Sequence, residues 1–281
     1  MFVFLFLFAF LNQASSSPVS VSVTSDQASS SPVSFPFPTI TRFNFPSFTP
    51  TSCIDGNLTC TGSATSYDDY LSLTPEPQPG NPTLQLNQVG RVLYKYPLFA
   101  WPARFYTRFT FRILTSPYST ESADGLTFIM APNSSPSPAD SFGSYLGIMD
   151  PAQDGRAADQ LAVEFDTYKN TFDLDGNHVS IDKKSVINPI STRSLNETGI
   201  DLKSGKDIKV SIILNGGTNS LTIYVGYASK LSRRVLLNVP IDIPHTLPSF
   251  MYVGFTASTG YLTGSHQILS WRLSSYPIPK K

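Results

Sequence analysis

The sequence predicts an all-β fold, built as a sandwich of antiparallel sheets. Aromatic residues make up 12% of the 281 residues and charged residues only 14%, a balance that favours sheets with large apolar faces. From residue 41 onward, short runs of alternating apolar and polar residues are separated by clusters of Gly, Pro, Asn and Ser. No segment keeps the 3.6-residue apolar period of a helix. Many short strands joined by such turns are typical of a β-sandwich.

The first 40 residues do not resemble a folded domain. Residues 1–11 form an unbroken apolar run followed by small residues, which is too short to span a bilayer but fits the core of a signal peptide. We therefore expect a signal peptide over residues 1–16. The octapeptide Gln-Ala-Ser-Ser-Ser-Pro-Val-Ser occurs twice, and segments so rich in Ser and Pro cannot bury a core. Residues 17–40 are expected to be a disordered leader.

A single domain is expected over residues 41–275, with a tail at 276–281, because no second linker interrupts the alternating runs. Aromatic alternation begins at Thr41–Phe45. The further predicted strands are Phe105–Leu114, Gly125–Ala131, Ala162–Thr167, His178–Ile181, Ile208–Leu214, Leu221–Tyr227, Val235–Val239, Met251–Ala257 and Gln267–Leu273.

The signal peptide and the absence of a later apolar stretch long enough for a membrane anchor predict a secreted protein. In an oxidising compartment, Cys53 and Cys60 are expected to pair across a six-residue turn-like loop as a local staple. Asn57, Asn133 and Asn196 each begin an N-x-[ST] sequon and are candidate glycosylation sites. The 20 acidic and 20 basic residues balance, so nothing indicates nucleic acid or an anionic membrane as a partner.

Residues 162–178 carry the strongest functional signal. Glu164, Asp166, Tyr168 and Asn170 fall at every second position, so on a strand they project from one face. Carboxylates so placed repel each other unless a cation lies between them. A solvated polar strand edge is the simpler interpretation of an isolated Glu-x-Asp, but the further ligands that follow make a metal site the better one.

The ligand chemistry divides between two ions. Glu164, Asp166, Asp173 and His178 mix carboxylates with one imidazole, which suits a transition ion such as manganese or zinc. Asp166, Asn170 and Asp173 with a backbone carbonyl form an all-oxygen set, which suits calcium. Asp166 and Asp173 would bridge the two ions.

The ordered set of motifs in residues 41–275 resembles the legume-type (L-type) lectin family. The matching pieces are Gly90-Arg91-Val92-Leu93-Tyr94, Ala123-Asp124-Gly125, Val163-Glu164-Phe165-Asp166-Thr167, His178-Val179-Ser180-Ile181-Asp182 and His266 to Trp271. The run Asp-Leu-Asp-Gly-Asn-His is especially similar to the extracellular lectin domains of plant receptor kinases, although this sequence shows no kinase.

The resemblance implies a jelly-roll sandwich of two antiparallel sheets that carries one Mn²⁺ and one Ca²⁺, with the Tyr168 carbonyl completing the calcium ligands. It implies a sugar site made from Asp124, the backbone amide near Ser144, the Asn170 side chain and the stacked ring of Tyr168. It also implies a cis bond at Ala123–Asp124. The expected partners are glycans or glycoproteins, and weak sites of this kind gain strength in a homo-oligomer. The expected location is extracellular, in the apoplast or cell wall, with the vacuole as the alternative.

The sequence departs from the family pattern at several positions. Ser144 stands where many members have glycine, and Phe172 replaces a frequent tryptophan. Asp175 competes with Asp173 as the second bridging acid, and Asp173 is preferred because its five-residue step to His178 fits the pattern. The seven-residue Cys53–Cys60 step is not typical of seed lectins.

Two rival functions follow from the same residues. Sandwich-fold glycoside hydrolases also place Glu-x-Asp on a strand, but they continue to a further acid, and Lys169 stands at that position here. Retaining hydrolysis needs two available carboxylates, and we therefore expect no enzyme activity. The second rival is a lectin fold that has lost sugar binding, with a role in protein interaction, storage or signalling. The main reason to retain this second alternative is Ser144, which stands where many family members have glycine.

Overall fold

The computed structural model describes residues 40–77, 85–156, 159–230 and 234–278. The chain divides into two compact units, Met1–Pro36 and Phe37–Lys281. The predicted signal peptide and the predicted leader up to residue 39 lie outside the described residues. All the described residues belong to the second unit.

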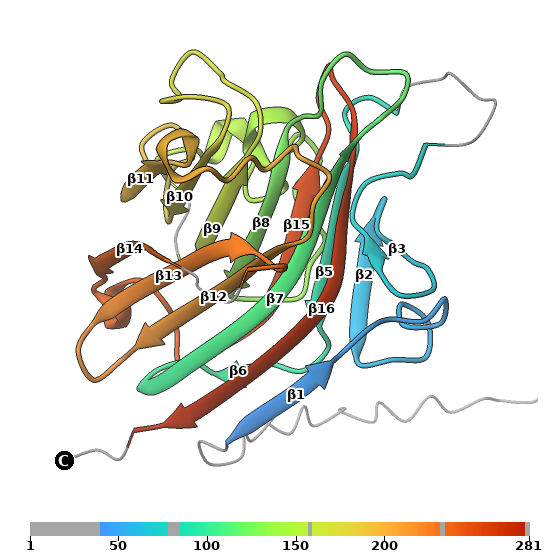
Figure 1. Cartoon of the computed structure of the whole chain (residues 1–281). Coiled ribbons are helices and arrows are strands. Elements are labelled where there is room, and N and C mark those ends of the chain that lie inside the picture. Colours follow the sequence, from blue (N-terminus) through green and yellow to red (C-terminus); the bar gives the residue numbers. More distant parts are fainter. Residues whose placement is uncertain (1–39, 78–84, 157–158, 231–233, 279–281) are drawn as a thin grey trace, which may run out of the picture. The chain divides into compact units, whose positions relative to one another are not determined.

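One sheet of the second unit is built around two long neighbouring strands, which Figure 1 shows side by side. They are β7 (Ala103–Thr115) and β16 (Gly264–Pro277). The sheet order is β14-β13-β12-β7-β16-β4-β3, and β1 also pairs with β16. The remaining strands span Arg234–Pro240 (β14), Ser220–Tyr227 (β13), Ile208–Asn215 (β12), Leu71–Ser72 (β4), Thr65–Ser66 (β3) and Thr41–Phe45 (β1).

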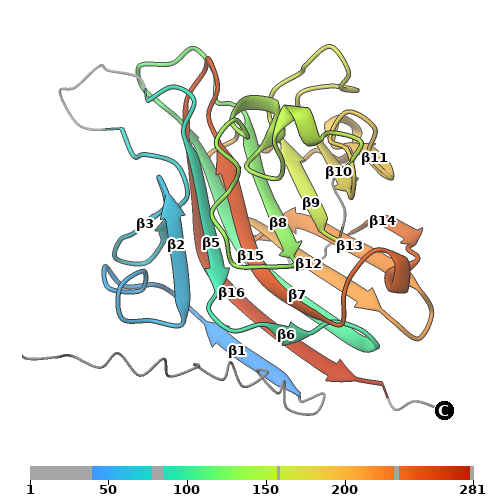
Figure 2. The ribbon, with the colours of Figure 1, turned by 180° about the vertical axis from the view of Figure 1, so that it is seen from behind.

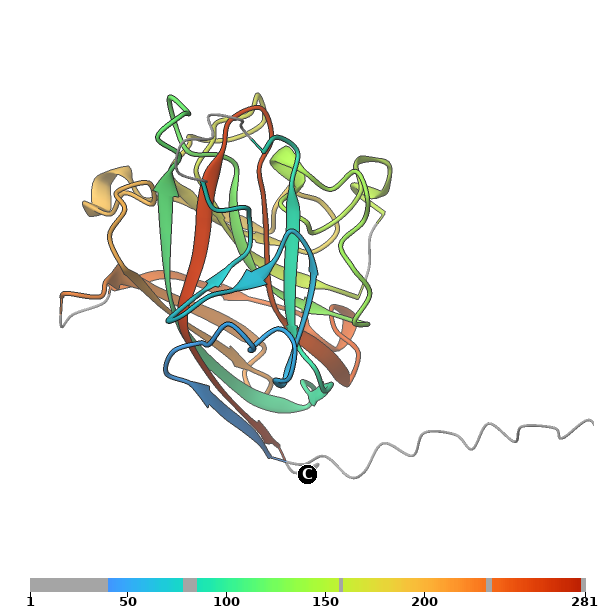
Figure 3. The same cartoon turned by 90° about the vertical axis from the view of Figure 1, so that its right-hand side faces the viewer.

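The other sheet has the order β11-β10-β9-β8-β15-β5-β2, and β6 pairs with β15. Figure 2 shows its strands from behind, and Figure 3 shows both layers from the side. All strand pairings among the described residues of both sheets are antiparallel. The strands span Ser191–Ser194 (β11), His178–Asp182 (β10), Leu161–Asp166 (β9), Gly125–Ala131 (β8), Phe250–Ser258 (β15), Val89–Tyr94 (β5), Leu58–Gly62 (β2) and Leu98–Phe99 (β6).

The core between the sheets is rich in aromatic rings. The Phe255 ring lies 4.9 Å from the rings of Phe109 and Trp271, both edge-on. Phe165 of β9 stands edge-on to Phe109 at 6.0 Å. These four side chains are at most 1% exposed. Edge-to-face pairs add stability beyond the burial of their area, so the low charge and high aromatic content of the sequence are explained by this layer.

The back of the second sheet is also covered. Leu146, Ile148 and Met149 from the segment after β8 form a second buried apolar cluster with Ala162 of β9 and Leu93 of β5. Every residue of β9 is therefore buried. Glu164 and Asp166 on its outward face are only 2% and 1% exposed, which excludes the solvated-edge interpretation.

The predicted all-β sandwich is confirmed. All nine internal strands expected from the alternation are present, with ends that shift by up to four residues. The described residues contain no α-helix, only 3₁₀ turns. β16 continues through Tyr276 and Pro277, two residues beyond the expected domain end, because both extend the pairing with β7. Six strands were not anticipated, namely β2, β3, β4, β5, β6 and β11.

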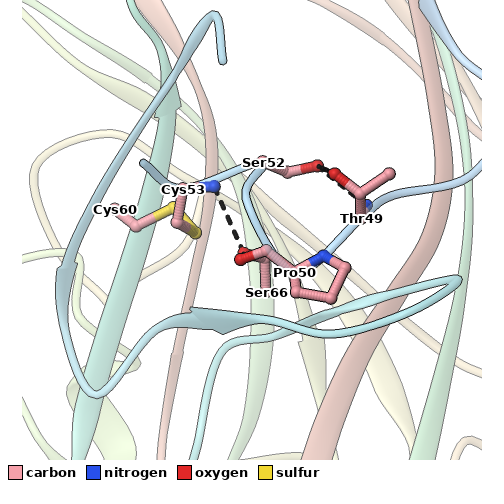
Figure 4. Close-up of a disulfide and its surroundings, with 6 residues drawn as sticks. All are labelled: Thr49, Pro50, Ser52, Cys53, Cys60 and Ser66. Atoms are coloured by element: carbon pink, nitrogen blue, oxygen red, sulfur yellow. Dashed lines mark hydrogen bonds between the residues drawn. A yellow bond between two sulfur atoms is a disulfide. The ribbon is translucent and has the colours of Figure 1, made fainter. Parts of the chain in front are cut away.

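The predicted cysteine pair forms a disulfide between Cys53 and Cys60, with Cα atoms 5.5 Å apart. Figure 4 shows the bridge beside the hydrogen bond that the Cys53 backbone N–H donates to Ser66 Oγ, at 3.2 Å. Ser66 in turn donates to the carbonyl oxygen of Pro50 at 2.7 Å. The disulfide thus fixes the turn that leads into β2.

Candidate metal and ligand-binding site

Strand register brings the predicted metal ligands together. β9 lies between β8 and β10, and His178 of β10 is directly opposite Asp166. Ser180 is opposite Glu164 in the same register. Because opposed residues in antiparallel strands point to the same face, the imidazole and both acids share the outer face of the sheet.

Three of the predicted ligands meet at one point. Ligand atoms of Asp166, Asp173 and His178 all lie within 4.8 Å of one another. His178 Nδ1 lies 2.6 Å from the carbonyl oxygen of Asp175. Since a carbonyl can only accept, Nδ1 is the donor in this hydrogen bond, and Nε2 is the ring nitrogen left to face a ligand. A metal-binding histidine is typically oriented in this way by an acceptor behind it.

The loop between β9 and β10 separates the roles of its two aspartates. Asp173 Oδ2 accepts a hydrogen bond from the Asn170 backbone N–H at 2.7 Å and belongs to the three-residue ligand group. Asp175 instead accepts from the Asn177 backbone N–H at 2.9 Å and from Asn196 Nδ2 at 3.0 Å. The geometry therefore favours Asp173 as the bridging acid, with Asp175 holding the loop to the segment after β11.

The buried carboxylates raise one another's pKa. Burial and the charge of Asp173 raise the pKa of Glu164 to about 8. Burial and the neighbouring Glu164 and Asp173 hold the pKa of Asp166 well above its usual range. Asp182, which the sequence reasoning did not propose, is fully buried, and burial and Glu164 raise its pKa in the same direction. Its alternation with His178 and Ser180 along β10 was the signal that could have revealed it.

Asp124 is held at the start of β8. The Ala123–Asp124 peptide bond is cis, as the sequence resemblance implied. The Asp124 backbone N–H donates to the Ser258 carbonyl at 3.0 Å, and its carbonyl accepts from both the N–H and the hydroxyl of Thr167 at 2.9 Å. Burial and the charge of Asp173 raise the pKa of the Asp124 carboxyl to about 7. Its Oδ2 atom is buried with no hydrogen-bond partner in the described part of the chain.

Two loops meet at the Asp124 carboxylate. A Cβ atom added to Gly260 would lie 2.6 Å from Asp124 Oδ2 and 3.3 Å from the Cα of Gly143. Ser144 follows Gly143 in a 3₁₀ turn, Gly143–Tyr145, and is half-buried. Ser258 Oγ donates to the Gly143 carbonyl at 2.7 Å. The loop around Gly260 therefore joins Asp124 to the Ser144 turn, and the sequence reasoning had assigned it no role.

Asn170 and Tyr168 complete the set of predicted sugar ligands. Asn170 Oδ1 is buried and has no hydrogen-bond partner among the described residues. The Tyr168 backbone N–H donates to Asp166 Oδ1 at 2.7 Å, while its side chain is 39% exposed. Such exposure of a ring beside buried polar groups suits stacking on an apolar ligand face.

These observations fit a divalent-cation site. Asp124, Glu164, Asp166 and Asp173 crowd together and favour protonation of one another. Two buried oxygens, Asp124 Oδ2 and Asn170 Oδ1, lack partners, although buried polar atoms usually have one. Carboxylates, an amide and one imidazole form a donor set that accepts calcium and a transition ion.

Comparison with known proteins agrees with this geometry. The family model of the legume lectin domain matches residues 40–281. The chain belongs to the legume lectin family. Its members are non-catalytic carbohydrate-binding proteins, which confirms both the family resemblance and the expectation that the chain is not an enzyme.

Individual relatives cover most of the domain. A lectin from Pisum sativum is 30% identical over 249 residues, which cover 84% of this chain and 83% of that protein. A probable L-type lectin-domain containing receptor kinase from Arabidopsis thaliana is 32% identical over 214 residues, covering 74% of this chain and 32% of the kinase. The solved structure of lectin UEA-II complexed with galactose has a TM-score of 0.71 at 27% identity, covering 84% of this chain and 98% of that chain. The described residues of the present protein contain no helix long and apolar enough to cross a membrane.

Proposed function

We propose that this protein is a metal-dependent lectin that binds a mono- or oligosaccharide without cleaving it. The observation that carries the proposal is the buried Asp124 carboxylate, whose Oδ2 lacks a partner and lies against the Gly260 loop. The solved relative complexed with galactose supports a sugar as the ligand class.

The proposed ion ligands follow the donor chemistry. Glu164, Asp166, Asp173 and His178 are proposed to hold Mn²⁺, and Asp166, the Tyr168 carbonyl, Asn170 and Asp173 to hold Ca²⁺. When bound, these ions supply the positive charge that keeps the buried carboxylates ionised. The chain itself orders the site, because Thr167 binds the Asp124 carbonyl and Asn170 binds Asp173 through its backbone N–H.

Sugar recognition is assigned to four groups. The Asp124 carboxylate accepts from adjacent sugar hydroxyls, while the Asn170 side chain and the backbone amide near Ser144 donate to them. The exposed Tyr168 ring covers a C–H face of the sugar. So shallow a set of contacts gives an affinity of about 1 mM, or ~4 kcal/mol. Stable retention on a glycan surface then requires several sites that bind at once. We therefore propose that the protein forms a homo-oligomer, which light scattering would detect.

The test is retention of the metal-loaded protein on a panel of immobilised glycans, with and without chelator. Asp124→Ala should abolish retention while the calcium and manganese contents and the circular dichroism spectrum stay unchanged. Asp140→Ala is the matched control, because Asp140 is an exposed aspartate. Retention of the Asp124→Ala variant, or retention that the chelator does not reduce, would contradict the proposal. Release of cleaved sugar would indicate a hydrolase.

A second candidate is a lectin fold without sugar binding, which the Ser144 position favours. The Ser144 side chain extends from the same 3₁₀ turn that reaches the Gly260 loop, and a side chain there can crowd a ligand. Ser144→Gly distinguishes the two candidates. Retention that appears only in this variant would show that the natural site is closed.

We also propose that the protein is secreted and N-glycosylated. Asn57, Asn133 and Asn196 are all exposed, as acceptor asparagines must be. Glycopeptide mapping of protein isolated from its source would test the three positions. Cell fractionation would separate the apoplast or cell wall from the vacuole.

A further inference from the structure

A second polar feature lies away from the carboxylate cluster. Arg91 is on β5, opposite Thr256 of β15 and Thr61 of β2. Its alternation with the core residue Val92 places it on the outer face of the sheet. The side chain is nevertheless buried, since Arg91 is only 5% exposed.

The Arg91 guanidinium has no counter-ion among the residues that the structure describes. No described carboxylate lies within ion-pair distance of it, and its Nε atom is buried without a hydrogen-bond partner. The buried acid Glu164 lies in register with Arg91 across the sheet, but strands β15 and β8 lie between the two residues. The hydroxyls of Thr127 and Thr256, 2.6 Å apart, occupy the positions in between.

The electrostatics agree with this isolation. Burial alone lowers the pKa of Arg91, to about 10, so the group stays charged at neutral pH. A buried charge without a partner is costly, often by several kcal/mol, and folded proteins rarely keep one. A guanidinium offers five N–H donors in a planar fork that matches the oxygens of a carboxylate, sulfate or phosphate.

A pocket of about 220 Å³ opens beside this guanidinium. Thr61, Asn87 and Ser137 contribute polar groups to its wall, and Pro136 and Pro138 cover it. None of the described residues that line it is acidic. Pockets for drug-sized ligands usually measure about 300–1,000 Å³, so the space suits a small ion or a single charged group.

We propose that this pocket is an anion-binding site, in which Arg91 holds a small oxyanion of the carboxylate or sulfate type. The Arg91 fork binds two oxygens of the anion, and the Asn87 amide and Thr61 hydroxyl, which belong to residues that line the same pocket, complete the contacts. The proposal does not depend on the proposed sugar function, because it uses no residue of the Asp124 site.

The test is thermal unfolding of the metal-loaded protein at fixed pH and ionic strength, with chloride replaced stepwise by sulfate or by acetate. At ten times the dissociation constant, a specific ligand should raise the melting temperature by about 3–6 °C. Sulfate also stabilises proteins through exclusion from their surface. The informative quantity is therefore the difference in the anion-dependent rise in melting temperature between the natural protein and its variants.

Two variants provide that difference. Arg91→Met removes the charge at similar length, so it should abolish the anion-dependent rise and leave only the general sulfate effect. Arg193→Met is the matched control, since Arg193 is exposed on β11 of the same sheet, and it should keep the full response. An equal rise in all three proteins would overturn the proposal.

A direct measurement covers the case in which Arg91→Met does not fold. Crystals of the natural protein soaked in selenate should show an anomalous peak within hydrogen-bond distance of the Arg91 guanidinium. Comparison of soaks in selenate with soaks in a bromine-substituted carboxylate distinguishes the two anion classes. Absence of a peak beside Arg91 in both soaks would overturn the proposal.

Discussion

Removal of the proposed metal ions should reverse the way in which stability depends on pH. In the metal-free protein, burial and the neighbouring carboxylates raise the pKa of Glu164 to about 8 and that of Asp124 to about 7. Both values lie above those of unfolded carboxyl groups, near 4. The folded state therefore holds more protons than the unfolded state above about pH 4, and its stability falls as pH rises through the folded pKa values.

The magnitude follows from these two groups. Between pH 6.5 and 8, the loss is about 1.6 kcal/mol for Glu164 and about 0.8 kcal/mol for Asp124 by proton linkage. Asp166 and Asp182, whose pKa values are also raised, act in the same direction. The loss of about 2.4 kcal/mol from Glu164 and Asp124 alone corresponds to a fall in melting temperature of about 5–10 °C for a domain of this size.

The choice of pH window matters because of His266. Burial lowers the pKa of this histidine to about 3. Below pH 6.5, His266 is therefore protonated in the unfolded state and neutral in the folded state. That contribution makes stability rise with pH, opposite to the carboxylates, and it ends near pH 6.5. The carboxylates thus dominate cleanly above this value.

The assay is thermal unfolding of chelator-treated and calcium- and manganese-loaded protein from pH 6.5 to 8. The chelated protein should lose stability with rising pH, whereas the loaded protein should keep or gain it, since bound cations favour ionised ligands. Glu164→Gln in the chelated protein should remove the largest part of the slope. A chelated protein that is as stable at pH 8 as at pH 6.5 would refute this account of the cluster.

Three further predictions follow from single positions. Gly260→Ala should weaken sugar retention about tenfold, because its Cβ would lie 2.6 Å from Asp124 Oδ2 and displace the carboxylate; unchanged retention with full metal content would contradict this. Tyr168→Ala should lower sugar affinity by about 1 kcal/mol through loss of stacking, whereas Tyr168→Phe should leave it unchanged. Titration calorimetry would compare the natural protein with both variants. Equal affinities for all three proteins would show that the Tyr168 ring does not contact the sugar. Replacing Cys53 and Cys60 together by Ser should lower the free energy of unfolding in urea by about 2–3 kcal/mol, since the bridge closes only a short loop; no loss would mean that the bridge is not formed in solution.

The fold was largely predictable because its signals are local. Alternation along β12 and β13 marks which residues face the core, and turn residues mark the strand ends. The strands that were missed have weaker patterns. β2 contains Cys60 and three polar or glycine residues, and β11 is entirely polar or charged at Ser191–Ser194. Such edge segments become strands through pairing with a neighbour, which no local pattern records.

The candidate site was predictable only in part. Period-two spacing identified Glu164 and Asp166, and the next strand supplied His178. Contacts between distant segments could not be read in the same way. The Gly260 loop meets Asp124 through the pairing of β15 with β8, across more than a hundred residues of sequence. The isolation of Arg91 from every acid is likewise a property of the packed structure.

The candidate site residues on β9 are held in place because the same strand packs against the core. Along β9, Phe165 packs against Phe109 and Phe111 on one face, while Glu164 and Asp166 lie on the other. The positions of these acids are thus fixed by apolar packing, whatever occupies the space between them. The loop after β9 has fewer such constraints, because Asp173 is half-buried and held mainly by the backbone of Asn170. Loss of the proposed cations should therefore loosen this loop and the proposed sugar contacts first, and leave the sandwich folded until the buried carboxylates ionise.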